Sequence, residues 1–88
     1  PQYFNFLEEE GIIIAEDAQG HPATSSIFEL YTKPLGIKSI LDIPIWYNQK
    51  IIGVFCVEHC SNRKWLEEEI QFVRLLSSLY SFSFRKEK

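Results

Sequence analysis

The residues best suited to chemistry lie in two neighbouring segments, 38–47 and 50–59. They are a base, an acid and an imidazole, set among aliphatic and aromatic side chains: Lys38, Asp42 and His59. An apolar concave surface with a few convergent polar groups is typical of a small-molecule site. Charged residues at strand ends are also commonly just exposed to solvent, so a solvated face with cross-strand ion pairs is the alternative. Which of the two applies, a small-molecule site or a solvated face, depends on which of these side chains lie on the same face of the strands.

Motifs for catalysis and for metal binding do not occur in the sequence. There is no Ser-His-Asp arrangement, no P-loop and no dinucleotide-binding glycine pattern, so we predict that the chain is not an enzyme. Cys56, His59 and Cys60 could supply metal ligands. Alternation along a strand would send His59 to the face opposite the two cysteines, and we therefore expect no metal site. Two unpaired thiols fit a reducing cytoplasm.

The two segments are predicted to pair as a hairpin, because only Asn48 and Gln49 separate them. Pairing outward from this turn places one set of residues on a mixed face, which we expect to line a cavity: Lys38, Ile40, Asp42, Phe55, Val57 and His59. The other face is apolar and is expected to form the core. A one-residue bulge would exchange the faces. Pro44 has no amide donor, so we expect either an edge or a bulge near it.

Three shorter elements are predicted before the hairpin. Residues 4–9 are expected to end a short helix, and the β-branched run at 12–15 is expected to be a buried strand. A short helix is predicted over 27–32, because Ser26 and Glu29 have the spacing of a capping box. Pro34 and Gly36 should end it.

A long amphipathic helix is predicted from about residue 66 to the end of the chain. Its apolar stripe contains Leu66, Ile70, Val73, Leu76, Tyr80 and Phe84, widened by Phe72, Leu79 and Phe82. The solvated face is expected to contain Glu67, Gln71, Arg74, Ser78, Ser81 and Arg85. The apolar arc is wider than one sheet contact requires. We expect its surplus to form a parallel dimer seam through Leu76, Leu79, Tyr80, Phe82 and Phe84. Packing within the domain is the alternative, because it would bury the same residues.

Composition excludes several classes of protein. The 88 residues are 45% hydrophobic and 15% aromatic, which supports a packed core rather than a disordered chain. The net charge is -3 and the pI is about 5.3, so we expect no nucleic-acid partner. No apolar run approaches the length that a membrane span needs, and no membrane insertion is expected. The chain has no Met and its last helical pattern runs to its end, so we expect residues 1–88 to be part of a larger protein.

Five separate blocks of this sequence resemble one known family. They are AEDA at 15–18, HPAT at 21–24, LGI at 35–37, SILDIPI at 39–45 and GVFCVEH at 53–59, and Trp65 follows them. The chain is similar to the GAF domain of bacterial sensor proteins, chiefly sensor histidine kinases and diguanylate cyclases. The resemblance covers residues 3–84 but only the C-terminal part of the family's domain, without its first helix and strand.

This resemblance implies an α+β fold with a central antiparallel sheet and helices on both faces. It places the helices of the two chain ends on one face, and a ligand cavity closed by short helices and loops on the other. Tyr31 would lie in the roof of that cavity, and Asp42 and His59 match pocket positions. In bilin-binding members a chromophore-attaching Cys lies where this chain has Ile27. We therefore expect no covalent bilin and no other cofactor.

Two functional hypotheses follow. The first is a non-enzymatic, cytoplasmic sensory domain of the two-component type that binds an unknown small molecule. Lys38 and His59 would hold an anionic or polar group, and Asp42 would accept hydrogen bonds from it. A homodimer formed through the C-terminal helix would relay occupancy of the cavity to an output domain in the same chain. The second hypothesis is a dimerisation module of the same fold that binds no ligand.

Overall fold

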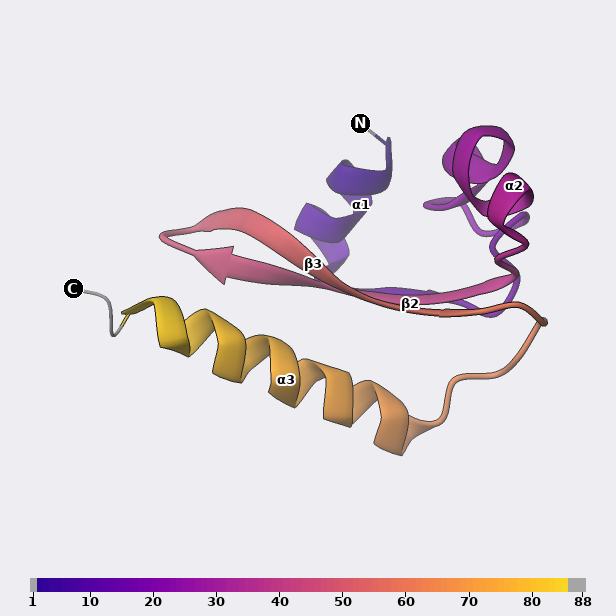
Figure 1. Ribbon diagram of the computed structural model, residues 1–88. Helices are drawn as coiled ribbons and strands as arrows, with labels where there is room; N and C mark the ends of the chain where they lie inside the picture. Colours follow the sequence, from indigo (N-terminus) through magenta and orange to yellow (C-terminus); the bar gives the residue numbers. More distant parts are fainter. Residues whose placement is uncertain (1, 86–88) are drawn as a thin grey trace.

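The predicted hairpin is the centre of the structure. In the computed structural model, which describes residues 2–85 and side chains up to Ser83, β2 (Ser39–Tyr47) and β3 (Lys50–His59) pair antiparallel (Figure 1). Asn48 and Gln49 connect them, and both have a positive φ, of 51° and 65°. Two successive left-handed residues are the signature of a type I′ turn, whose twist matches that of the flanking strands.

The sheet has three strands in the described chain. β1 (Ile13–Ala15) pairs antiparallel with β2, and the order is β1-β2-β3. β1 pairs with β2 only as far as Asp42, so at Pro44 one edge of β2 has no strand partner among the described residues. A residue without an amide donor is tolerated there because no ladder hydrogen bond is lost. The expectation of an edge or bulge at Pro44 is confirmed.

The register of the hairpin differs from the predicted one beyond a bulge. Tyr47 pairs with Lys50 as expected, but the register then shifts between Ile45 and Trp46 and leaves Ile52 without a partner. From there on every residue of β3 pairs one position away from its predicted partner. Ile45 pairs with Gly53, Asp42 with Cys56, Ile40 with Glu58 and Ser39 with His59. The predicted face is therefore wrong for Phe55, Val57 and His59, which lie on the face opposite Asp42.

One face of the sheet is covered by α1 (Gln2–Glu10) and by three short helical segments (Figure 1). These segments are η1 (Ser25–Ile27), η2 (Phe28–Thr32) and α2 (Lys33–Leu35). The predicted capping box is wrong, because no side chain caps η1. The hydroxyl of Thr24 donates instead to the carbonyl of Ala18, at 2.6 Å. The core on this face contains Leu7, Ile13, Ala15, Ala18, Ala23 and Ile40.

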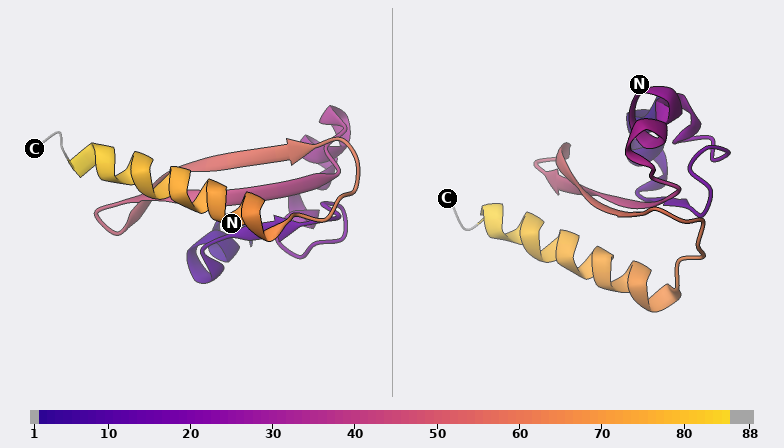
Figure 2. Two further views of the ribbon diagram at one scale, coloured as in Figure 1. Left: turned by 90° about the horizontal axis from the view of Figure 1, so that it is seen from below. Right: turned by 45° about the vertical axis from the view of Figure 1, so that its right-hand side comes forward.

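The other face is covered by α3 (Glu67–Arg85), which runs along the hairpin in all three views (Figures 1 and 2). The helices of the two chain ends therefore lie on opposite faces, so the prediction that they share one face is wrong. The core under α3 contains Leu41, Ile43, Trp65, Ile70 and Val73. None of the described helices combines the length and the apolarity that crossing a bilayer requires.

Two serines decide which face of α3 contacts the sheet. Ser77 is buried and donates to the carbonyl of Pro44 at 2.8 Å, and Ser81 donates to the carbonyl of Trp46. Small side chains let the helix approach β2, and their hydroxyls bond to backbone carbonyls of that strand. Ser81 was predicted to face solvent, but it contacts β2 and is only half-buried. Ile70 and Val73 of the predicted stripe pack against the sheet, whereas Leu79 is 57% exposed.

The turn allows a stability prediction. Gln49 occupies a left-handed conformation that costs a residue with a Cβ about 1–2 kcal/mol. Gln49→Gly should therefore raise the free energy of unfolding by about 1 kcal/mol, measured by urea denaturation. Lys50→Gly is the matched control. It should lower the free energy of unfolding, because Lys50 begins β3 without a positive φ and glycine there loses more backbone entropy on folding. A Gln49→Gly variant less stable than the parent would contradict the type I′ assignment.

Candidate functional site

A cluster of polar side chains lies on the face that α1 and the short helices cover. Asp42 comes from β2, Cys56 and Glu58 from β3, Tyr3 from α1 and Tyr31 from η2. The register brings the three strand residues together, because Asp42 and Cys56 are directly opposite and Glu58 is two residues further along the same face. Four separate elements thus contribute to one site.

Hydrogen bonds join the two tyrosines to the two carboxylates. The Tyr3 hydroxyl donates to Oδ2 of Asp42, and the Tyr31 hydroxyl donates to Oε2 of Glu58 at 2.6 Å. Asp42 is only 3% exposed, yet its second oxygen, Oδ1, has no hydrogen-bond partner among the described residues. The Cys56 thiol donates weakly to the Val54 carbonyl, at 3.9 Å. The cluster therefore has one buried acceptor in excess.

Burial dominates the electrostatics of the cluster. It raises the pKa of Asp42 to about 6, although the contacts with Tyr3 and Cys56 act in the opposite direction. Burial and the neighbouring Asp42 carboxylate raise the pKa of Cys56 to about 12. The hydrogen bond to Glu58 raises the pKa of Tyr31 to about 12, and burial together with Asp42 raises that of Tyr3 further still. At neutral pH the thiol and both phenols stay protonated.

This arrangement suits binding rather than covalent chemistry. A thiol is a nucleophile only as the thiolate, so Cys56 with its raised pKa is unreactive at neutral pH. Asp42 Oδ1 can accept a hydrogen bond from a donor that enters the site. The five side chains of the cluster include no cation, which makes them complementary to an N–H or O–H donor or to a positive charge. Within the described part of the chain, no three acids, histidines or cysteines are arranged so that they could hold a metal ion.

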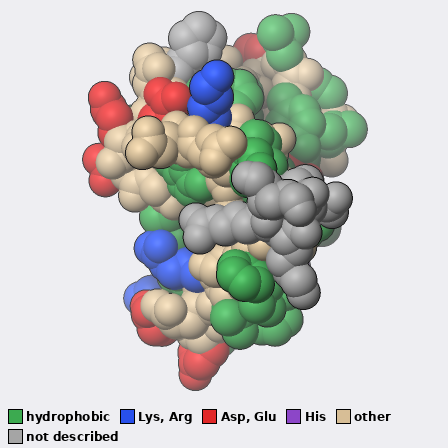
Figure 3. All heavy atoms as spheres, turned by 90° about the vertical axis from the view of Figure 1, so that its left-hand side faces the viewer, with side chains coloured by type: hydrophobic (Ala, Val, Ile, Leu, Met, Phe, Trp, Pro, Cys, Tyr) green, Lys and Arg blue, Asp and Glu red, His purple; other side chains and the backbone are tan. Residues whose placement is uncertain are grey.

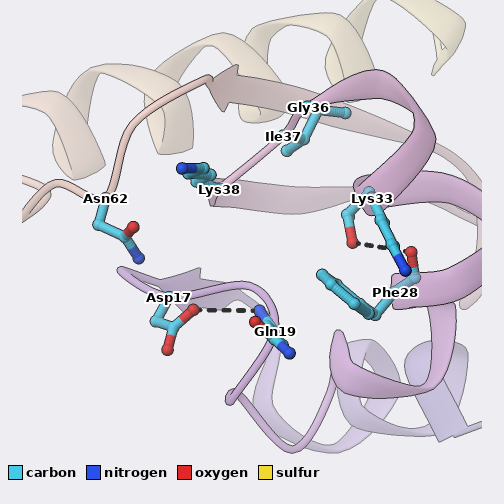
Figure 4. A pocket seen from close by; sticks show the side chains of 9 residues that line it. Asp17, Gln19, Phe28, Lys33, Gly36, Ile37, Lys38 and Asn62 are labelled. Atoms are coloured by element: carbon cyan, nitrogen blue, oxygen red, sulfur yellow. Dashed lines mark hydrogen bonds between the residues drawn. The ribbon is translucent and has the colours of Figure 1, made fainter.

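Of the seven residues predicted to line the cavity, only Tyr31 and Asp42 meet in this cluster. Ile40 shares their face but is buried in the core beside α1. Lys38 precedes β2 and lines a separate cavity at the end of the sheet (Figure 4).

The other three predicted residues lie on the α3 side because of the bulge. The ring of Phe55 packs edge-on against that of Tyr80, with centroids 5.6 Å apart. Val57 lines an apolar groove of about 260 Å³ beside α3. The imidazole of His59 accepts a hydrogen bond from the backbone of Ser61 at 3.2 Å, and no contact joins it to Asp42.

Three members of the cluster escaped prediction: Tyr3, Cys56 and Glu58. The signal that could have found the last two was Pro44, which indicated a bulge close to it. Once a one-residue bulge is placed in β3, alternation brings Cys56 and Glu58 to the side of Asp42. Tyr3 reaches Asp42 across 39 positions of sequence, and no local pattern indicates such a contact.

Comparison with known proteins identifies the family. The sequence profile of the GAF domain matches residues 5–84, so the chain belongs to the GAF domain family. Domains of this family are generally sensory and non-catalytic. A search of curated proteins found no match.

Several solved structures have a similar fold, and two of them illustrate it. One is a far-red cyanobacteriochrome photoreceptor, with a TM-score of 0.79 and 21% identity over 93% of this chain and 53% of that one. The other is a domain assigned to a two-component sensor histidine kinase protein of Sinorhizobium meliloti 1021, with a TM-score of 0.67 and 18% identity over 86% of this chain and 52% of that one. The chain thus spans about half the length of each. At such identities the likeness concerns the fold alone.

The buried carboxyl of Asp42 leads to a prediction about pH. The rise of its pKa from 3.8 to about 6 corresponds to at most about 3 kcal/mol of unfolding free energy. Between these pH values the folded protein binds the proton more tightly than the unfolded chain does. The free energy of unfolding of the parent should therefore fall as the pH rises from about 4 to about 6. Above this range the contribution of Asp42 should no longer change with pH.

Asp42→Asn removes the titration but keeps an acceptor for the Tyr3 hydroxyl. The variant should be more stable than the parent at neutral pH by about 2 kcal/mol, and this advantage should disappear near pH 4. Urea denaturation at several pH values measures both curves. An advantage that does not change with pH would show that Asp42 does not titrate in this range.

Proposed function

We propose that this GAF domain binds a small molecule at the Tyr3–Asp42–Glu58 cluster and relays its occupancy through α3 to an output domain, without catalysing a reaction. The observation that carries the proposal is Asp42 Oδ1, a buried acceptor that no described residue satisfies with a hydrogen bond. Leaving a buried polar atom unpaired costs about 1–3 kcal/mol, and more when it is charged. A ligand that donates a hydrogen bond to this oxygen removes that cost, and the free energy gained contributes to the affinity of the ligand.

The chemistry of the cluster favours a particular class of ligand. Two carboxylates and no cation would repel an anion, so the ligand presents an N–H or O–H donor, or a positive charge, to Asp42. The earlier expectation of an anionic group between Lys38 and His59 has no support here, because neither residue lies in the cluster. Tyr31, Cys56 and Glu58 are exposed at the rim of the cluster, while the Asp42 carboxyl beneath them is buried.

α3 presents a second apolar face that suits the relay. Phe72, Leu75, Leu79 and Phe82 are large, exposed and spaced by three, four and three residues. This is the spacing of the a and d positions of a coiled coil. Viewed from the hairpin end, hydrophobic side chains gather at the lower end of the molecule, where α3 lies (Figure 3). We expect two copies of α3 to pack in parallel through this face.

This face revises the predicted dimer seam. Leu76 borders it, while the ring of Tyr80 turns toward Phe55 in the same chain. Phe84 was also predicted to belong to the seam, but its side chain lies outside the described residues. Leu75 belongs to the seam and was missed, because the predicted stripe was centred on the side of α3 that packs against the sheet.

β3 connects the site with the helix. Cys56 faces Asp42, and the adjacent Phe55 faces Tyr80 on α3. Side chains of neighbouring strand residues point to opposite faces. A ligand that shifts this part of β3 would therefore also move the contact with α3. A packed helix pair with two discrete arrangements would turn such a shift into a signal.

The dimer seam is tested by one substitution and a matched control. Leu79→Glu should convert the dimer to a monomer, because it places a charge in the centre of an apolar interface. Leu30→Glu is the control, since Leu30 is 91% exposed but lies on η2, and it should leave the dimer intact. Size-exclusion chromatography with light scattering measures the mass. Dimers in both variants would exclude the α3 seam.

Ligand binding is tested separately by native mass spectrometry of the purified chain. The parent should carry a discrete additional mass that Asp42→Ala loses and Leu30→Glu retains. The alternative, a dimerisation module without a ligand, is favoured by the exposed face of α3 and predicts bare dimers for all three proteins. An additional mass that persists in Asp42→Ala would place the ligand elsewhere.

A further inference from the structure

A second cavity, which shares no residue with the Asp42 cluster, lies at the end of the sheet next to α2. It has a volume of about 240 Å³, and Asp17, Phe28, Lys33, Lys38 and Asn62 are among the residues that line it (Figure 4). We propose that this cavity binds a small zwitterion of the amino-acid type with an aromatic side chain. The proposal is independent of the ligand at Asp42.

The walls of this cavity are held in place by the backbone. The amide of Ala18 donates to the carbonyl of Lys38, and the amide of Lys38 donates to the carbonyl of His59, both at 2.8 Å. The side-chain amide of Asn62 donates to the carbonyl of Glu16 at 3.3 Å. These bonds connect three chain segments that are far apart in sequence, so the cavity needs little ordering before a ligand binds.

Ser39, which follows Lys38 in the chain, adds hydrogen bonds between the same chain segments. This side chain is fully buried, and its hydroxyl oxygen lies 2.9 Å from the carbonyl oxygen of Glu16 and 2.8 Å from that of Ser61. It also accepts a hydrogen bond from the amide of Arg63 at 2.8 Å. One buried hydroxyl thus joins the loop after β1 to the loop after β3, directly beside the cavity.

The cavity presents charges of both signs that are not paired with each other. Lys38 has no ion-pair partner among the described residues. Among the described residues, the Asp17 carboxylate accepts a hydrogen bond only from the amide of Gln19 in its own loop, at 3.2 Å. A free carboxylate on the ligand would meet Lys38, and a free ammonium would meet Asp17. An ion of a single charge would attract one of these residues and repel the other.

The far wall offers a place for an aromatic side chain. Figure 4 shows the Phe28 ring across the cavity from Lys38 and Asp17. The ammonium of Lys33 lies 5.9 Å from the centre of this ring and 3.6 Å from a carboxylate oxygen of Glu29. Lys33 is thus already partly neutralised, whereas Lys38 is not. A ligand ring beside Phe28 would gain the energy of an aromatic pair.

The volume limits the size of the ligand. The cavity has a volume of about 240 Å³. This is smaller than the pockets of drug-sized ligands, which start at about 300 Å³. The volume suits a ligand of the size of a single amino acid better than a peptide or a nucleotide.

Three related probes test the proposal in an NMR titration of the full chain. L-Phenylalanine carries both charges, phenylacetate only the carboxylate, and phenethylamine only the ammonium. L-Phenylalanine should cause saturable shifts of the amides of Asp17, Lys38 and Asn62. The other two probes should bind about tenfold more weakly, because each leaves one charge of the cavity unmatched. Equal binding of phenylacetate would indicate a simple anion site, and no saturable shift with any probe would also overturn the proposal.

Variants of the chain supply the second test. Lys38→Met and Asp17→Asn should each weaken binding of L-phenylalanine about tenfold, while Lys50→Met, at an exposed lysine outside the cavity, should not. The amide spectrum of each variant shows whether it is folded. Asp42→Ala should bind L-phenylalanine like the parent, which separates this site from the one proposed above. Loss of binding in Lys50→Met would show that only net charge matters, contrary to the proposal.

Discussion

One unpaired residue in β3 determines which side chains form the polar cluster and which contact α3. Because Ile52 has no partner in β2, every residue beyond it is displaced by one position along the hairpin. Cys56 and Glu58 therefore lie beside Asp42, and Phe55 points to α3. Without this bulge the aromatic ring would lie next to the buried carboxyl, and the thiol and the second acid would face the helix. The polar cluster exists only in the observed register.

The same strand separates two environments of opposite character. On one side the cluster contains a buried acceptor that has no hydrogen-bond partner among the described residues, and the apolar packing around it must offset the cost. On the other side α3 packs through Ile70, Val73 and Ser77, and leaves Phe72, Leu75, Leu79 and Phe82 exposed. Both features are unfavourable in an isolated domain. Each would become favourable if a partner covered it, which is the physical basis of the proposed ligand binding and dimerisation.

Two buried polar side chains, Ser39 and Asp42, differ in how far their hydrogen-bonding capacity is satisfied. Ser39 meets three backbone partners and ties together the loops at one end of the sheet. Asp42 meets Tyr3 and leaves one oxygen unsatisfied. A fully satisfied buried group makes its surroundings rigid, whereas an unsatisfied one retains the capacity to bind. The satisfied Ser39 hydroxyl therefore makes the end of the sheet rigid. The unsatisfied Asp42 oxygen leaves an acceptor in the middle of β2 that can take one more hydrogen bond.

The sequence by itself determined the hairpin, its turn at Asn48 and Gln49, the last helix and the family, because each depends on local periodicity or on nearby motifs. The register of β3 required the tertiary structure. Both faces of this strand carry apolar residues, so shifting it by one position leaves the hydrophobic pattern equally satisfied. The predicted stripe of α3 included Ile70 and Val73, which pack against the sheet, but its apolar arc is wider than that contact, so the sequence left open which other residues stay exposed. Hydrogen bonds from Ser77 and Ser81 to β2 form only when helix and sheet meet, and no sequence pattern indicated them.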